Sequence, residues 1–99
     1  MMKLRINPLV AKDLKSIKDY IAEDNADKAL ETVQEIYHQF ESIQQFPYIG
    51  ADLSKRVSFK TDYKYVVWQD YVVLYKVVKE AVEIYQVVNR YQDITRIFV

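Results

Sequence analysis

The sequence predicts one α+β domain, residues 1–99, in which a helical hairpin packs on a mostly antiparallel sheet. Apolar residues recur at helical spacing between residues 9 and 45. Residues 63–89 are instead rich in Val, Tyr and Ile, as strands are. Residues 3–6 alternate polar and apolar side chains, as a half-buried strand does. The predicted order is β-α-α-β-β-β with a four-stranded sheet, the helices lying on one side of it.

The first strand, Lys3–Ile6, leads directly into the first helix. Asn7 suits the cap of that helix, and Pro8 suits its first position because the N–H that proline lacks would be unpaired there. We expect the helix to run to about Glu23. Its apolar stripe follows the spacing i, i+4, i+7 and i+11 and consists of Val10, Leu14, Ile17 and Ile21.

The second helix begins after Asn25, which is a good cap, and packs antiparallel against the first because the connection is short. Its apolar stripe consists of Ala26, Ala29, Leu30, Val33, Ile36 or Tyr37, Phe40 and Ile43. The helix ends at Phe46-Pro47, since a residue before proline avoids helical geometry. Gly50 is the only glycine in the chain, and we expect it in a turn that needs a positive φ.

The second half of the chain predicts a sheet. Residues 51–62 are polar and form a loop that runs into an edge strand near Val57–Phe59. Three strands follow, at Tyr63–Trp68, Tyr71–Val78 and Val82–Asn89, and the short turns between them make them antiparallel neighbours. One face of the sheet packs on the hairpin and the other is partly open. Residues 90–99 form a last helical turn or an extended arm.

The composition excludes several classes of function. The chain has 14 basic and 14 acidic residues, whereas a generic nucleic-acid binder is basic, so we expect no sequence-specific DNA binding by this chain alone. It has no cysteine, one histidine and one glycine, which excludes the usual zinc sites and Gly-rich phosphate loops; no metal or cofactor is expected. The N-terminus lacks the apolar core of a signal peptide, and no apolar run approaches the roughly 18 residues of a membrane span. We therefore expect a soluble, cytoplasmic protein.

The ordered set of segments resembles the RelE/ParE superfamily of bacterial toxins from type II toxin–antitoxin modules. The residues that carry this resemblance are the hairpin of residues 6–50, the strand Tyr71–Val77 and the C-terminal segment Val87–Asp93. The resemblance implies growth inhibition by the toxin and a cognate antitoxin protein as its partner. It covers nearly the whole chain.

Two kinds of target are implied by the two branches of this superfamily. RelE-like members cleave messenger RNA on the ribosome with arginines, lysines and a tyrosine or histidine, whereas ParE-like members poison DNA gyrase and are not nucleases. The nuclease arginine expected after Tyr71 is Val72 here. The one expected near the tail is Gln92, or is served at best by Arg90 two residues earlier. The C-terminal aromatic, Phe98, has no hydroxyl to exchange a proton. These departures favour the ParE-like branch, while leaving open whether the chain is an enzyme.

Candidate site residues remain for the alternative, an mRNA interferase. The catalytic candidates are Lys60, Lys64, Arg90 and Tyr91. The candidates for binding a target or phosphate are Lys55, Arg56, Arg90 and Arg96. Two structural alternatives are an ordinary solvated loop for residues 55–64 and packing of Tyr91 on the sheet. The exposed tyrosines suit an antitoxin-binding groove. A third hypothesis is an inactive relative that acts only as a binding module.

Overall fold

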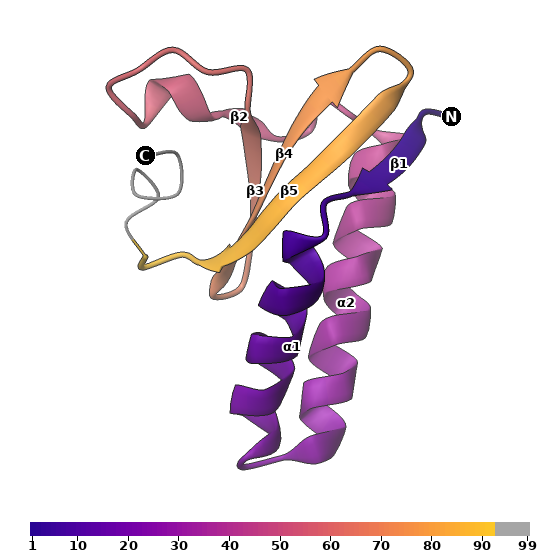
Figure 1. The fold of residues 1–99 in the computed structure, drawn as a ribbon, viewed down its shortest axis with the longest axis vertical. Helices are drawn as coiled ribbons and strands as arrows, with labels where there is room; N and C mark the ends of the chain where they lie inside the picture. The colour runs from indigo at the N-terminus through magenta and orange to yellow at the C-terminus, as the bar shows by residue number, and fades with distance from the viewer. Residues whose placement is uncertain (93–99) are drawn as a thin grey trace.

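The computed structural model describes residues 1–92 and confirms the predicted α+β order (Figure 1). Two helices form the hairpin, and β2 is followed by a short 3-10 helix, η1. The elements in chain order are β1 (Lys3–Ile6), α1 (Leu9–Ala22), α2 (Ala26–Gln45), β2 (Ala51–Asp52), η1 (Leu53–Lys55), β3 (Lys64–Trp68), β4 (Tyr71–Val78) and β5 (Ala81–Asn89). The tail predicted for residues 90–99 lies outside the described residues from residue 93 onward.

The sheet has five strands within residues 1–92, whereas the predicted β-α-α-β-β-β order counts four, and the strands lie in the order β1-β5-β4-β3-β2. It is mixed: β1 runs parallel to β5, and the other neighbours are antiparallel. The edge strand predicted near Val57–Phe59 is wrong, because the strand that pairs with β3 is Ala51–Asp52. The buried side chain of Leu53 then anchors the chain as it leaves the sheet in η1.

Both helices begin close to where their caps predict. Asn25 Oδ1 accepts a hydrogen bond from the backbone N–H of Lys28 at 3.0 Å, so the cap of α2 is confirmed. Asn7 Oδ1 accepts from the N–H of Leu9 at 2.9 Å, and α1 starts just after Pro8 instead of at it. The short connection between the helices makes them neighbours, and their far end extends beyond the sheet (Figure 1).

The main core lies between the hairpin and one face of the sheet. Its buried residues come from both helices, β4 and β5: Val10, Leu14, Ile36, Phe40, Ile43, Val73, Tyr75, Val82, Ile84 and Val87. Leu30 and Tyr37, predicted in the apolar stripe of α2, are 52% and 44% exposed. Each stands one position, or about 100°, around the helix from a buried residue, so it points away from the core. Between the alternatives Ile36 and Tyr37, Ile36 is the buried one.

The prediction that Gly50 needs a positive φ is wrong, since Gly50 has no such conformation. A Cβ built on Gly50 would lie 2.5 Å from the hydroxyl oxygen of Tyr75 and 2.9 Å from the carbonyl oxygen of Tyr65. Glycine is therefore required by close packing. The positive φ values occur in the β3–β4 and β4–β5 turns, at Gln69 (53°) and Glu80 (65°).

Candidate functional site

The sheet face turned away from the hairpin, here called the second face, carries a smaller core and a group of aromatic and basic side chains. Tyr75 and Val77 pack toward the hairpin, so the alternation of β4 points Leu74 and Lys76 the other way. The second core consists of Leu53, Val72, Leu74 and Val88. Three half-buried tyrosines, Tyr63, Tyr65 and Tyr85, pack against this second core. The second face is therefore partly covered by η1 and partly open.

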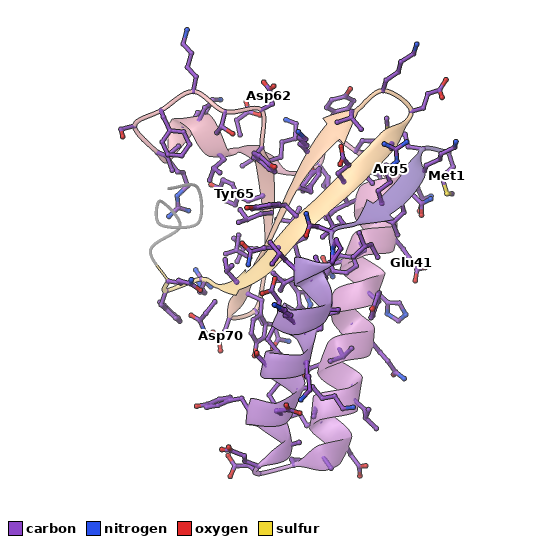
Figure 2. The ribbon with its side chains drawn as sticks, in the orientation of Figure 1. Met1, Arg5, Glu41, Asp62, Tyr65 and Asp70 are labelled. Atoms are coloured by element: carbon purple, nitrogen blue, oxygen red, sulfur yellow. The ribbon has the colours of Figure 1, made fainter. Side chains whose placement is uncertain are left out.

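Aromatic rings and cations alternate across the second face. The rings of Tyr63 and Tyr85 lie 5.3 Å apart between centroids, and Lys76 Nζ lies 5.5 Å from the centre of the Tyr63 ring. Arg56 Cζ lies 5.4 Å from the centre of the Tyr65 ring. These distances are within the range of cation–π attraction. Tyr65 and Arg5, labelled in Figure 2, come from β3 and β1, on either side of β4 and β5.

A β-bulge in β5 fixes the position of Tyr85. Tyr75 pairs with Ile84 and Leu74 pairs with Gln86, which leaves Tyr85 as the extra residue of β5. Beyond the bulge, the N–H of Val87 donates to Asp13 Oδ2 of α1 at 3.0 Å, and Gln86 Nε2 donates to Asp13 Oδ1 at 3.3 Å. Burial raises the pKa of Asp13, although these two hydrogen bonds oppose the increase.

The structure places the predicted loop residues in different surroundings. Lys64 pairs with Tyr75 and shares its side of the sheet, where Lys64 Nζ lies 2.7 Å from Asp52 Oδ1. That hydrogen bond lowers the pKa of Asp52. Arg56 lies on the second face, beside Tyr65. Lys55 and Lys60 are exposed, one at the end of η1 and the other in the following loop.

Arg90 and Tyr91 lie at the other end of the sheet. The backbone N–H of Arg90 donates to the carbonyl oxygen of Asp70 at 2.8 Å, and Arg90 Nη1 donates to that of Gln69 at 3.3 Å. Tyr91 is 78% exposed, so it does not pack on the sheet. Arg90 Cζ lies 5.6 Å from the centre of the Tyr91 ring. Arg96 lies outside the described residues.

Arg90 and Tyr91 are therefore neighbours, but the structure does not bring Lys64 to them. Lys64 is the first residue of β3. Arg90 contacts Gln69, in the turn that follows the last residue of β3. A strand of 5 residues spans about 16 Å. Groups that exchange protons with one reacting centre need contacts of about 3 Å with it. Lys64, which is paired with Asp52, and Arg90, which is paired with Gln69, do not form such a set.

The sequence-based candidates omitted Arg5 and Lys76, two basic residues of the second face. Arg5, Glu83 and Lys76 are aligned across three neighbouring strands, because Arg5 pairs with Glu83 and Glu83 pairs with Lys76. The signal for Lys76 was present: it stands between Tyr75 and Val77 in an apolar strand, so alternation turns it to the opposite face. For Arg5, the missing information was the parallel pairing of β1 with β5.

Known proteins identify the class to which this fold belongs. The chain superposes on a solved chain described as "Chromosomal ParDE TA system from P. aeruginosa" with a TM-score of 0.75 and 25% identity. The match covers 90% of this chain and 96% of that chain. The fold is thus that of a toxin–antitoxin protein. No curated protein sequence matches the chain significantly.

The family follows from the sequence match. A family model described as "ParE toxin of type II toxin-antitoxin system, parDE" matches residues 4–94. The chain therefore belongs to the ParE toxin family, and the predicted resemblance to the RelE/ParE superfamily is confirmed. Neither helix of residues 1–92 combines the length and apolar character that crossing a membrane requires.

Proposed function

We propose that this toxin inhibits growth by binding DNA gyrase and that a cognate antitoxin neutralises it by binding to it. The observation that carries the proposal is the ParE family match over residues 4–94. Action by binding also agrees with the arrangement of the site. Val72, where the nuclease arginine is expected, is 3% exposed and belongs to the second core, so it offers no group to an RNA substrate.

The second face supports recognition of a protein target. Its tyrosines are rigid, amphipathic side chains, and Tyr and Arg are enriched at protein interfaces and at their energetic hot spots. The rings of Tyr63, Tyr65 and Tyr85 present such surface beside Arg56 and Lys76. A formal net charge of zero gives no general attraction to nucleic acid. These properties favour a protein target over an RNA one.

Exposed apolar surface supports an antitoxin partner. Phe46, Tyr48 and Ile49 follow α2 closely and are 57%, 73% and 60% exposed. Apolar side chains gathered at the surface are typical of sites that a partner covers. An antitoxin that binds only the folded toxin stabilises it by mass action, by about 2.7 kcal/mol at a hundredfold excess over its Kd. The melting temperature of the toxin should therefore rise by roughly 10–20 °C.

The decisive experiment assays two targets with the same purified toxin. In a supercoiling assay with DNA gyrase, ATP and relaxed plasmid, we expect loss of supercoiling and recovery when antitoxin is added. In a parallel translation reaction we expect ribosome-bound messages to stay intact. Message cleavage that Arg90→Ala abolishes would overturn the gyrase proposal and establish the mRNA interferase alternative.

Expression in a bacterial host without antitoxin provides the cellular counterpart. Pulse labelling should show an early fall in DNA synthesis, with protein synthesis falling later. An immediate fall in protein synthesis would contradict the proposal. If neither synthesis falls and gyrase is not inhibited in the purified assay, the chain is the inactive relative that acts only as a binding module.

A further inference from the structure

A concave site lies at one end of the second face, where β1 leaves the sheet and α1 begins. It has a volume of about 340 Å³, which is at the lower end of the range for ligand pockets. Its walls combine aromatic and charged side chains from β1, β4, β5 and the residue preceding β3: Arg5, Tyr63, Lys76, Glu83 and Tyr85. We call it the Arg5–Lys76 pocket. None of its charged residues was among the sequence-based candidates.

The two cations of the Arg5–Lys76 pocket form no ion pair within residues 1–92, where the ion pairs involve Lys15, His38 and Lys64. Glu83 stands between Arg5 and Lys76 in the strand register without forming an ion pair to either. Lys76 Nζ instead lies over the ring of Tyr63. With two cations and one carboxylate, the pocket has a formal charge of +1 and donors available for one acidic group.

From this arrangement we infer that the Arg5–Lys76 pocket binds an Asp or Glu side chain of the antitoxin, held between the Arg5 guanidinium and the Lys76 ammonium. This inference rests on the proposed neutralisation by an antitoxin. A carboxylate accepts hydrogen bonds from both cations, and such charge-assisted bonds are stronger than neutral ones. The rings of Tyr63 and Tyr85, whose centroids lie 5.3 Å apart, form an aromatic wall of the same pocket.

The pocket favours a peptide carboxylate over the phosphates of a nucleic acid. Glu83 repels every additional negative charge, so a single carboxylate is tolerated better than a row of phosphates. Glu83 also makes the pocket selective, since a partner without a well-placed acidic group gains little binding energy there. The volume suits one acidic side chain and its neighbours.

The test measures the affinity of the purified full-length toxin for its cognate antitoxin by titration calorimetry. We expect Arg5→Ala and Lys76→Ala each to weaken binding roughly tenfold, because tenfold is about 1.4 kcal/mol and one hydrogen bond to a charged group is worth about that much. The double variant should lose less affinity than the product of the two single fold-losses, because both cations bind the same antitoxin carboxylate. Glu83→Gln should tighten binding several-fold, a gain that damage to the fold would not produce.

Lys3→Ala is the matched control, because Lys3 is an exposed cation of the same strand, β1, outside the pocket lining. It should change the affinity less than twofold. Far-UV circular dichroism checks that each variant keeps its fold. A fluorescently labelled single-stranded RNA, titrated with the same proteins, tests the phosphate alternative.

Each outcome decides a different point. Weaker binding by Arg5→Ala and Lys76→Ala with tighter binding by Glu83→Gln supports the pocket. Unchanged antitoxin affinity in all three variants overturns it, and so does RNA binding that depends on Arg5 and Lys76 while antitoxin binding does not. Weaker binding by Glu83→Gln also overturns it, since the partner would then supply a cation. If the wild-type toxin does not bind antitoxin at all, the proposed neutralisation fails together with the pocket.

Discussion

Replacing Gly50 by alanine should destabilise the protein strongly, although only a methyl group is added at a loop position. The Tyr75 side chain is fully buried, and its hydroxyl joins two points of the loop after α2. It donates to the carbonyl oxygen of Pro47 at 2.9 Å and accepts from the N–H of Gly50 at 2.9 Å. The new Cβ would lie 2.5 Å from this hydroxyl, so either Tyr75 or the loop must move.

The magnitude follows from two contributions. Overpacking of a well-packed core costs typically 1–3 kcal/mol. Displacing the Tyr75 hydroxyl weakens two hydrogen bonds, each worth about 1 kcal/mol. Since φ of Gly50 is not positive, backbone strain adds nothing. We expect a loss of about 3 kcal/mol in the free energy of unfolding, or a fall of roughly 12–24 °C in Tm for a domain of this size.

Urea unfolding followed by circular dichroism measures the effect, with the exposed loop substitution Ser58→Ala as the control. A double-mutant cycle with Tyr75→Phe identifies the cause. Tyr75→Phe removes the oxygen that the Cβ would meet at 2.5 Å, so Gly50→Ala should cost less in the Tyr75→Phe background than in the wild type. If Gly50→Ala changes the free energy of unfolding by under about 0.5 kcal/mol, as surface substitutions do, the packing argument is refuted.

Two further predictions concern pH and a turn. Because burial raises the pKa of Asp13 above its ordinary 3.8 in the folded state, its stabilising contribution is complete below that value and is lost as pH rises through the folded pKa. The free energy of unfolding of the wild type relative to Asp13→Asn should therefore fall as pH rises from below 3.8 through the folded pKa, and a constant difference would contradict this. Glu80 has a φ of 65°, so Glu80→Gly should raise the free energy of unfolding by about 0.5–1 kcal/mol. Lys79→Gly, at a neighbouring position without positive φ, should instead lower the free energy of unfolding. If thermal melts show equal effects for Glu80→Gly and Lys79→Gly, the turn argument is refuted.

The helices and long strands could be predicted because local patterns determine them. The cap at Asn25 and the apolar stripe of α2 are readable from neighbouring residues alone. The edge strand β2 has only two residues, Ala51 and Asp52, which is too short for any alternation to be recognised. The role of Gly50 depends on Tyr75, which is 25 positions away, so no local pattern indicates it.

The candidate site was harder to predict, because register across strands determines it. Lys64 was a reasonable candidate, but its pairing with Tyr75 turns it to the hairpin side. In β5, Ile84 and Val87 both face the hairpin core although they stand three positions apart, where uninterrupted alternation requires two or four. That break in the period indicates the bulge that places Tyr85 beside Tyr63.

The parallel pairing of β1 with β5 has a consequence for the newly made chain. Lys3 pairs with Ala81, which follows it by 78 positions, and the Arg5–Lys76 pocket combines side chains from Arg5 to Tyr85. At a synthesis rate of about 5–20 residues per second, Arg5 precedes Tyr85 out of the ribosome by roughly 4–16 s. During that interval β1 has no strand to join, and the surface that would recognise an antitoxin does not exist. A chain interrupted before residue 81 lacks this recognition surface, so a partner that binds the pocket does not recognise such a fragment.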